Sequence, residues 1–417
     1  MPDYPISDLE EQLRQDRRLG KARRRKRRLR KLLPILILLV LAAGIFLLFR
    51  IGKQEEETEP SPTYAPGSSV VTMNFVGDIS LDEAMMNRFR NGNDYDFTPL
   101  LRRIIPRLAS ADLTVGNLEG NVSAGAVSDG VYPPALLRDL YAVGFDVLQT
   151  ANSYSIQNGL TGLAETKAAI QAAGMDALGT WISPEDRAEN GVLIREVNGM
   201  RIAFLAFTKG MNSLRLPDGT EYCVNLLYTD YDTTYTKIAR SAIADAVMEA
   251  KLREPDLIVA MVHWGSEYDK NIADSQKEIA KLLFENGVHL IVGSHSHYVS
   301  AMELNSRTIT PYGGNFIAYS LGDFISTADT STARNGCVLS VTVCKDEEGT
   351  RITELHYAPT YSAAPNDELG TRDYEILDTQ DAISFYKNGY YDKVSDALYE
   401  KLVTAVEKMK ESTGLEP

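Results

Sequence analysis

The sequence is poor in cysteine, with only Cys223, Cys337 and Cys344 among its 417 residues. Three cysteines are too few for the disulfide framework that stabilises many small exported domains. Cys337 and Cys344 lie in one predicted strand, where seven residues span roughly 23 Å, far beyond the reach of a disulfide. We therefore predict no structural disulfide, and a chain of this length can bury a sufficient core without one.

Positive charge is scarce in the larger part of the chain. The sequence has 43 basic and 57 acidic side chains, of which 13 and 5 lie in residues 1–50, so 30 and 52 remain beyond that point. This excess of acidic groups argues against a general affinity for nucleic acid or for anionic membranes. An anionic ligand would need a local positive site or a metal ion to bind there.

Residues 32–49 (LLPILILLVLAAGIFLLF) contain no charged or strongly polar side chain. A helix of this length approaches the roughly 30 Å hydrocarbon core of a bilayer. A cleaved signal peptide is the alternative, but the run is longer than a typical signal core and no small-x-small cleavage site precedes Arg50. We therefore predict a transmembrane helix at residues 32–50 that anchors the chain in the lipid bilayer.

The charges beside this run predict its orientation. Residues 14–31 contain twelve lysines and arginines, whereas four glutamates lie between positions 55 and 59 on the other side. Residues 1–31 are therefore predicted to be a cytoplasmic basic segment and the main domain to be extracytoplasmic at the cell membrane. Nucleic-acid binding is the alternative for the basic segment, but its position favours anionic lipid headgroups. Residues 51–69 are rich in Glu, Pro, Ser and Thr and are predicted to be a disordered linker.

From residue 70 onward, short apolar runs alternate with amphipathic stretches. The runs predicted to be strands lie at residues 70–78, 111–120, 145–152, 200–208, 255–265, 288–297 and 315–324. Helical spacing occurs at residues 160–173, 235–253 and 275–286. This alternation predicts an α/β domain with substantial parallel pairing, covered by helices, with ligand chemistry at the carboxyl ends of its strands. We place this domain at residues 70–362 and a C-terminal helical extension at 363–417, which packs on the domain or binds a partner.

Histidine is also scarce, and three of the five histidines, His263, His295 and His297, stand directly after apolar runs. Imidazole is the commonest nitrogen ligand of transition metals, and a His-x-His pair at a strand end or tight loop places two rings on the same side. Asp78 and Glu119 follow the first two predicted strands. Each carboxylate alone also fits a turn or cap position. Together with the histidines they predict a metal site that clamps phosphate or activates water.

The motifs that contain these residues resemble the CapA family of poly-gamma-glutamate capsule synthesis proteins, which is related to calcineurin-like metallophosphoesterases. The matching segments, in the family's order between about residues 71 and 330, are FVGDISL, ADLTVGNLEGNVS, GLTGLAETKAAIQAAGMDALGT, GMRIAFLAF, DLIVAMVHWGSEYDK, LIVGSHSHYVSAME and AYSLGDFIS. The resemblance implies a four-layered α/β/β/α sandwich of metallophosphoesterase type. It also implies a role in the biosynthesis or export of capsule or another anionic surface polymer, and an anchor before the domain fits this family.

Carried over residue by residue, the resemblance implies a site for up to two divalent metal ions (Mn, Zn or Fe). The implied metal ligands are Asp78, Glu119, His263, His295 and His297. The implied substrate-binding residues around them are Trp264, Glu267, Tyr268 and Asp323, the last of which stands where the family commonly has Asn.

One segment departs from the family. Where the family usually reads Ala-Asn-Asn-His, this chain has Ala151, Asn152, Ser153 and Tyr154. In the phosphoesterase relatives the Asn-His pair supplies a metal-binding amide and a histidine that assists the leaving group. We expect Asn152, Tyr154 and His263 to be the remaining candidates for catalysis, although a phenol with a pKa near 10 is a poor general acid.

Three functions therefore remain open. The first is a CapA-type protein that acts with membrane-embedded polymer synthase or export subunits on an anionic surface polymer. The second is a metal-dependent phosphoesterase, which needs the catalytic pair that is replaced here. The third is a degenerate domain that binds polymer or a synthase subunit without catalysis. No nucleic-acid partner is expected in any of them.

Overall fold

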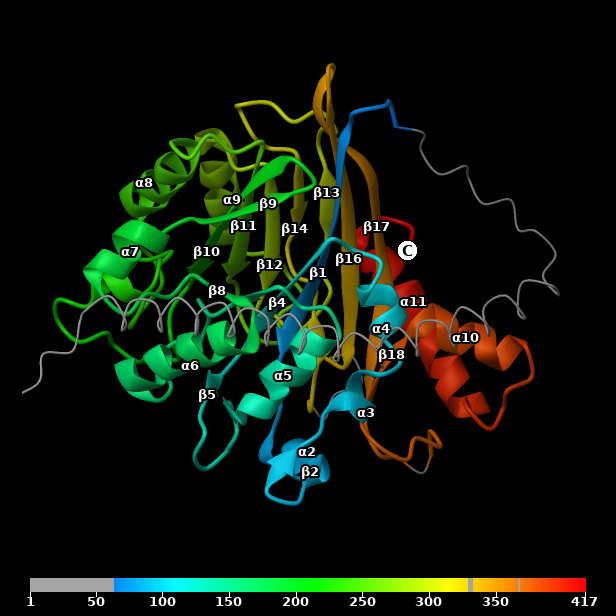
Figure 1. Ribbon diagram of the computed structural model, residues 1–417. Helices are drawn as coiled ribbons and strands as arrows, with labels where there is room; N and C mark the ends of the chain where they lie inside the picture. The colour runs from blue at the N-terminus through cyan, green and yellow to red at the C-terminus, as the bar shows by residue number, and fades with distance from the viewer. Residues whose placement is uncertain (1–63, 329–332, 367) are drawn as a thin grey trace, which may run out of the picture. The chain divides into compact units, whose positions relative to one another are not determined.

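The computed structural model describes residues 64–417 except 329–332 and 367, and Tyr64–Pro417 make up one unit (Figure 1). The predicted basic segment at 1–31, the predicted transmembrane helix at 32–50 and most of the predicted linker at 51–69 lie outside the described residues. Within those residues, no helix is both long enough and apolar enough to cross a bilayer. The described end of the predicted linker lies against the domain, because the Tyr64 hydroxyl is 3.2 Å from Thr353 Oγ1.

Two large sheets organise the domain. The larger sheet contains, from edge to edge, β18 (Glu375–Asp378), β17 (Gly349–Ala363), β16 (Asn335–Asp346), β1 (Ser69–Ile79), β4 (Leu113–Leu118), β7 (Val147–Gln149) and β8 (Asp176–Leu178), with β15 (Asp323–Ile325) paired to the end of β1. The smaller sheet contains β13 (Met302–Leu304), β14 (Phe316–Ala318), β12 (Leu290–Ser294), β11 (Leu257–His263), β10 (Met200–Thr208) and β9 (Leu193–Val197). Strands β1, β4, β7 and β8 are parallel to one another, and so are β10, β11, β12 and β14. The predicted parallel pairing is therefore confirmed.

The helices and the short strands connect these sheets. The helices are α2 (Glu83–Arg88), α3 (Thr98–Leu101), α4 (Ile105–Leu108), α5 (Pro134–Ala142), α6 (Gly159–Ala173), α7 (Pro184–Asn190), α8 (Arg240–Lys251), α9 (Asp274–Asn286), α10 (Thr379–Lys387) and α11 (Asp396–Thr413), with a 3₁₀ turn at Glu221–Cys223. Two small ribbons consist of β2 (Arg90–Asn91) with β3 (Asp94–Tyr95), and β5 (Asn121–Val122) with β6 (Val131–Tyr132). Helices α6, α8 and α9 overlap the three stretches predicted to be helical, and the C-terminal extension predicted to be helical contains α10 and α11.

Three hydrophobic cores show how the layers are stacked. An inner core between the two sheets contains Phe75 and Val115 from the larger sheet and Phe204 and Val259 from the smaller one. A second core joins the outer side of the larger sheet to α5 and α6, and a third joins the outer side of the smaller sheet to α8 and α9 (Figure 1). The order is therefore helices, sheet, sheet and helices.

Side-chain alternation explains why the strands are buried on both faces. In β11 the odd-numbered residues Leu257, Val259 and Met261 face the inner core, whereas the even-numbered residues between them face α8 and α9. Successive side chains of a strand point to opposite faces, so the odd-numbered His263 continues the inner row. The same parity places the next residue, Trp264, on the outer side.

A bulge changes this parity at the end of β1. Phe75 pairs with Val115, but Asp78 pairs with Asn117, so β1 contains one residue more than β4 over this stretch. Such an extra residue turns the following side chains to the other face. Gly77 occupies the bulge, and a Cβ there would lie 1.8 Å from the Gly322 carbonyl oxygen. The bulge therefore directs Asp78 toward the inner side, where Asn117 and His263 also lie.

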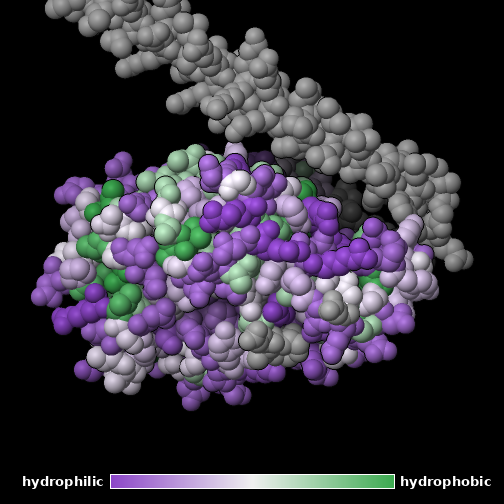
Figure 2. Space-filling view, turned by 90° about the horizontal axis from the view of Figure 1, so that it is seen from below, coloured by the Kyte–Doolittle hydropathy of each residue, from purple (hydrophilic) through white to green (hydrophobic). Residues whose placement is uncertain are grey.

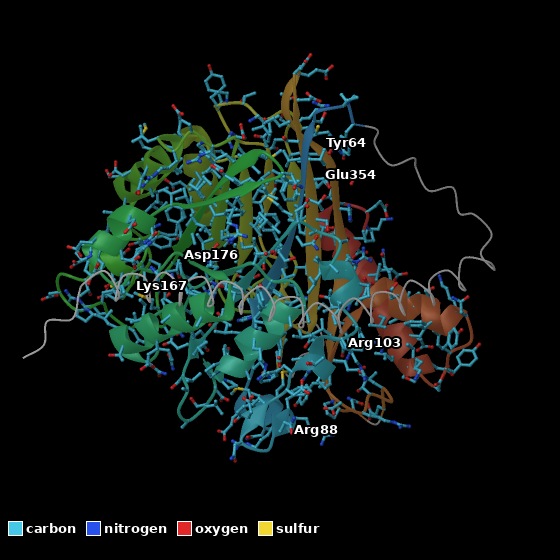
Figure 3. The ribbon with its side chains drawn as sticks, in the orientation of Figure 1. Tyr64, Arg88, Arg103, Lys167, Asp176 and Glu354 are labelled. Atoms are coloured by element: carbon cyan, nitrogen blue, oxygen red, sulfur yellow. The ribbon has the colours of Figure 1, made fainter. Side chains whose placement is uncertain are left out.

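The C-terminal region is part of the same domain. Strand β18 pairs with β17 beyond the predicted boundary at residue 362, and α11 contributes Ala405 and Met409 to the inner core. Arg88, Arg103 and Arg107 form ion pairs with Asp373, Glu375 and Asp378, so they connect the α2–α4 region to β18 and to the residues just before it. Figure 3 labels two of these arginines, Arg88 and Arg103. The extension therefore packs on the domain. Cys223, Cys337 and Cys344 are all buried free thiols, as expected.

One face of the domain has a mostly hydrophilic surface. The face shown in Figure 2 is dominated by hydrophilic side chains, and its apolar side chains form scattered patches. Scattered apolar residues are normal on a folded protein and do not by themselves indicate a docking surface.

Candidate metal centre

Buried ionisable side chains from both sheets meet at the carboxyl ends of the strands. Asp78 lies on β1 and Glu119 follows β4, whereas His263 ends β11 and His295 and His297 follow β12. All five are buried, and the most exposed, His297, is only 8% exposed. The structure therefore brings together every residue predicted to be a metal ligand.

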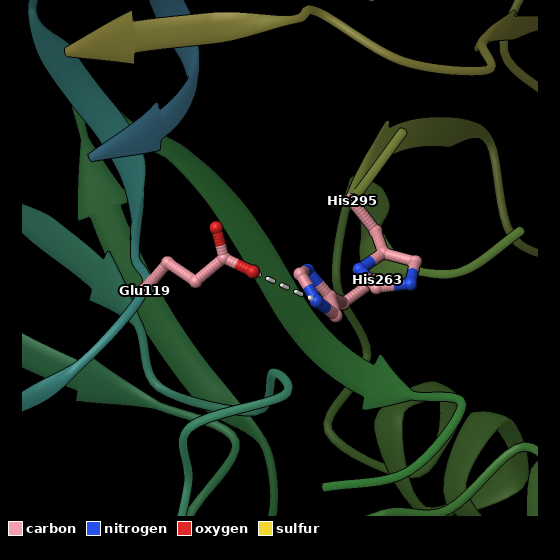
Figure 4. Close-up of side chains that lie close together, drawn as sticks. All are labelled: Glu119, His263 and His295. Atoms are coloured by element: carbon pink, nitrogen blue, oxygen red, sulfur yellow. Dashed lines mark ion pairs between the residues drawn. The ribbon is translucent and has the colours of Figure 1, made fainter. Parts of the chain in front are cut away.

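The first group consists of Glu119, His263 and His295, whose potential ligand atoms all lie within 4.8 Å of one another. Figure 4 shows Glu119 extending toward His263, and Glu119 Oε1 is 3.4 Å from His263 Nε2. The ring centroids of His263 and His295 are 4.4 Å apart. One carboxylate and two imidazoles at this spacing are typical ligands of a transition-metal ion.

The second group consists of Asp78, His297 and Asp323, with the same limit of 4.8 Å between ligand atoms. His297 Nδ1 is 2.7 Å from Asp323 Oδ1 and 3.9 Å from Asp78 Oδ2. Asp323 was predicted to bind substrate, and the structure also places it among the potential metal ligands. The cause is the pairing of β15 with the end of β1, which sets Asp323 opposite Asp78.

Two unpartnered atoms test whether the first group fits a cation. Glu119 Oε1 and His295 Nδ1 are buried and have no hydrogen-bond partner among the described residues. The 3.4 Å distance from Glu119 to His263 is an ion-pair distance and not a hydrogen bond. Because buried polar atoms are nearly always hydrogen-bonded, such atoms need a specific explanation. A divalent metal ion bound by both atoms would satisfy them, so the residues fit such an ion.

The pKa values of the buried carboxyl and imidazole groups are shifted from their usual values. Burial raises the pKa of Asp78 to about 6 despite the nearby His297, and burial together with the charge of Asp78 raises that of Glu119 well above its usual value. Burial lowers the pKa of His263 and His295, which keeps both imidazoles in the neutral, ligating form. Burial acts in the same direction on His297, but the Asp323 hydrogen bond and the surrounding carboxylates outweigh it and raise its pKa to about 10. The carboxylates therefore favour a nearby cation.

Left-handed backbone conformations hold in place the loop that follows β12 and carries His295 and His297. His295 and His297 have φ angles of 94° and 59°, values that are uncommon for residues other than glycine. The His295 N–H donates to Asp78 Oδ2 over 3.0 Å, and the Tyr268 N–H donates to the Ser296 carbonyl over 3.1 Å. Strained backbone of this kind is often found at functional sites. The rings of His295 and His297 lie 6.4 Å apart and belong to different groups.

The segment that departs from the family lies beside the first group. Ser153 Oγ is 3.0 Å from His263 Nε2. The Asn152 amide donates to Asn117 Oδ1 and to the Leu118 carbonyl, and its Oδ1 accepts from the Tyr154 N–H. These bonds occupy the Asn152 amide, so the structure does not place it as a free oxygen ligand. Burial raises the pKa of Tyr154 to about 12, with further contributions from Glu119 and Glu267, so this phenol stays protonated at neutral pH.

Three predicted substrate-binding residues lie in different surroundings. Trp264 is fully buried in the core beneath α9 and donates from Nε1 to the Tyr319 carbonyl over 2.9 Å. Trp264 therefore does not border the metal site, because it follows His263 directly and its side chain points to the opposite side of the sheet. Glu267 is exposed. Tyr268 is 52% exposed and stacks on His297 with 4.8 Å between ring centroids, so it does border the site.

Sequence reasoning missed Asn117 and Ser294. Asn117 donates to Asp78 Oδ1 over 2.6 Å, and Ser294 Oγ is 3.0 Å from His263 Nδ1. Both position a potential metal ligand through a hydrogen bond. Asn117 was detectable, because it stands two residues before Glu119 and continues the inward parity of Leu113 and Val115 on β4.

The fold and the site define an α/β protein with two buried residue groups that are compatible with divalent metal ions. The chain belongs to the bacterial capsule synthesis protein family PGA_cap, whose profile matches residues 72–328. The prediction of a CapA-type family is thereby confirmed, and the membership supports a capsule-related function.

Curated relatives and solved structures are similar to this chain. It is 26% identical over 354 residues to the capsule biosynthesis protein CapA of Bacillus anthracis, which covers 82% of this chain and 80% of that protein. It is 26% identical over 313 residues to the PGA biosynthesis protein CapA of Bacillus subtilis strain 168, with 70% and 72% covered. A phosphatase from Mycoplasma pneumoniae has a TM-score of 0.42 at 15% identity, covering 71% of this chain and 95% of that one. The calcineurin-like phosphoesterase YfkN from Bacillus subtilis has a TM-score of 0.39 at 12% identity, with 82% and 97% covered. These two scores are too low to support an inference about activity.

Proposed function

We propose that this chain is a membrane-anchored, extracytoplasmic CapA-like protein that acts in the biosynthesis or export of capsule or another anionic surface polymer of the poly-gamma-glutamate type. The family membership supports the link to capsule. The apolar run at residues 32–49 and the basic residues before it support the anchor and its orientation. Membrane-embedded synthase or export subunits are the partners that such a position would serve.

The observation that carries this proposal is the meeting of six buried carboxylate and imidazole side chains between two sheets. Glu119, His263 and His295 would hold one divalent ion, and Asp78, His297 and Asp323 a second, with Mn, Zn and Fe as candidates. When bound, such an ion supplies positive charge that holds and polarises carboxylate or phosphate oxygens. This chemistry allows a strongly acidic domain to accept an anionic polymer, in a four-layered sandwich of metallophosphoesterase type.

The chain's own residues arrange this site. Asn117 and the His295 N–H fix the two oxygens of Asp78, and Ser294 fixes the His263 ring through Nδ1. Tyr154, which stays protonated, is suited to donate a hydrogen bond to an anionic group and not to exchange protons. The site is therefore better equipped to bind and orient an anion than to cleave it.

A second candidate function follows from the same segment. Asn152 is occupied by internal hydrogen bonds, and Ser153 and Tyr154 supply no group that titrates near neutral pH. These observations favour a module that binds polymer or a synthase subunit without catalysis over a metal-dependent phosphoesterase. Assay of the purified chain with Mn or Zn added distinguishes these two. A phosphoesterase should hydrolyse a phosphodiester, whereas a binding module without catalysis should not.

The test of the proposal is genetic. Deletion of the gene should abolish or strongly reduce surface polymer, and the wild-type gene should restore it. A gene that encodes His295→Ala and His297→Ala should fail to restore it, whereas a gene with the exposed His356→Ala should succeed. An unchanged polymer profile after deletion would exclude the capsule function. Full restoration by the double variant would show that the capsule function does not need the metal centre.

A further inference from the structure

A cavity of about 250 Å³ opens beside the first metal group. Its lining includes His295, Ser153, Lys209, Tyr235, Ser266 and Glu267. Specific sites for whole small molecules usually enclose roughly 300–1,000 Å³. This cavity is therefore of a size for one part of a larger ligand, and it adjoins the unpartnered His295 Nδ1.

Lys209 is the only lysine or arginine among the described residues that line this cavity. It follows β10 directly, and its backbone N–H donates to the His263 carbonyl over 2.8 Å, which ties its position to that of a potential metal ligand. Its side chain is partly buried. The Nζ atom donates to the Gly265 carbonyl over 2.7 Å and lies 4.7 Å from the Tyr235 ring centroid. The ammonium is therefore held at the cavity by two contacts.

The charge of Lys209 has no ionic partner among the described residues. Glu267 also lines the cavity and raises the pKa of Lys209, but burial has the larger effect and lowers it. Lys209 and Glu267 do not form an ion pair with each other at 4.0 Å or less in the described part of the chain. An ammonium has three N–H donors, and only one of them has a hydrogen-bond partner among the described residues. Two donors therefore remain to bind a ligand.

We propose that this cavity is a subsite for one anionic group of the substrate, a carboxylate or a phosphate, which Lys209 binds next to the group held at Glu119, His263 and His295. The identity of the substrate as an anionic polymer rests on the proposed function. A polymer with a negative charge on each unit presents two such groups side by side. Ser153 also lines the cavity, and its hydroxyl lies 3.0 Å from His263 Nε2.

The charge of Glu267 provides an independent test of the subsite. It is exposed at the cavity, and its negative charge repels an anion that approaches Lys209. Removal of this charge should therefore strengthen anion binding, whereas removal of the Lys209 charge should weaken it. A merely structural role for Lys209, such as holding the Gly265 carbonyl, would not predict the effect of Glu267.

The experiment measures binding of inorganic phosphate, glutarate and γ-linked triglutamate to the full-length chain by calorimetry, with and without Mn. Lys209→Gln should weaken binding by at least about tenfold, because a charge-assisted hydrogen bond is lost. Lys209→Arg should retain most of the affinity, and Glu267→Gln should increase it. Lys270→Gln is the matched control: this exposed lysine lies over Tyr298, does not line the cavity, and should bind like wild type.

Each outcome decides the proposal. A stronger response to phosphate identifies a phosphate group, and a stronger response to glutarate or triglutamate identifies a carboxylate. No binding by wild type, equal binding by Lys209→Gln, or an equal loss in Lys270→Gln would overturn the subsite. Metal content and thermal unfolding of Lys209→Gln should match wild type, and if that variant unfolds early, Lys209→Arg and Glu267→Gln decide.

The two proposals fail in different ways. If gene deletion leaves the surface polymer unchanged while Lys209→Gln loses anion binding, the function is wrong and the subsite stands. If deletion removes the polymer but Lys209→Gln binds all three probes like wild type, the function stands and the subsite is wrong.

Discussion

The backbone N–H of His295 donates a hydrogen bond to Asp78 Oδ2 over 3.0 Å, between residues 217 positions apart in the chain. Asp78 lies near the end of β1 of the larger sheet, and His295 follows β12 of the smaller one. This bond therefore joins the two sheets at the point where both metal groups meet. It also fixes the loop that carries His295 and His297, so the geometry of each group depends on the other.

Removal of both loop histidines should abolish metal binding. His295 belongs to the first group and His297 to the second, so the double variant His295→Ala, His297→Ala leaves two side chains in each. We expect fewer than one metal ion per chain by elemental analysis, compared with up to two for wild type. His356→Ala, an exposed histidine on β17, should retain the wild-type content. Full stoichiometry in the double variant would show that the site lies elsewhere.

Asp78→Asn should stabilise the metal-free chain at alkaline pH while it abolishes metal binding. The folded-state pKa of Asp78 is about 6, above the value of 3.8 expected when unfolded. The folded state therefore binds this proton more tightly, and its contribution to stability is lost as pH rises from about 4 to about 6. The shift corresponds to a cost of about 3 kcal/mol above that window.

The measurement is urea unfolding of wild type and Asp78→Asn in the presence of chelator, between pH 4.5 and pH 8. The advantage of the variant should be larger at pH 8 than at pH 4.5, although the new amide loses part of the gain beside two hydrogen-bond donors, Asn117 and the His295 N–H. A difference that does not change with pH would contradict the raised pKa of the buried Asp78 carboxyl.

Gly77→Ala should destabilise the fold. A Cβ at this position would lie 1.8 Å from the Gly322 carbonyl oxygen, which also accepts a hydrogen bond from the Asp78 N–H. Backbone atoms cannot move aside as a side chain can, so we expect a loss of at least about 3 kcal/mol in the free energy of unfolding. Gly125→Ala is the control, because its nearest atom is Ser123 Oγ at 3.4 Å and its effect should stay below about 0.5 kcal/mol. Equal stabilities in denaturant would refute the close approach.

Restoring the family's pair should raise hydrolytic activity. The double variant Ser153→Asn, Tyr154→His places an amide beside His263 and replaces a phenol of pKa about 12 with an imidazole that titrates near neutral pH. Positioned acid–base groups contribute roughly 10²–10⁴-fold to rates, so Mn-dependent hydrolysis of a generic phosphodiester should increase at least about tenfold. Tyr154→Phe, which supplies no acid, should show no increase. A double variant no faster than wild type would mean that another feature prevents hydrolysis.

Local patterns in the sequence were enough to predict much of this protein. Apolar runs alternating with amphipathic stretches predicted a parallel α/β domain, and polar residues directly after those runs identified Asp78, Glu119, His263, His295 and His297. Such signals are local, since a strand end and the residue that follows it are neighbours in the chain. The family motifs added the link to capsule, whereas the anchor at residues 32–50 remains a prediction.

Only the tertiary structure decided how these residues are grouped. The bulge at Gly77 changes the parity of β1, and the pairing of β15 with β1 brings Asp323 into the second metal group. The cavity beside Lys209 depends on the loops that follow four strands, β7, β10, β11 and β12. Strand alternation directs Trp264 away from the metal groups, contrary to the substrate-binding role that the family resemblance implies. Sequence therefore determined which side chains stand at strand ends, and long-range packing of the two sheets determined which of them share a site, because those contacts join residues up to more than 200 positions apart.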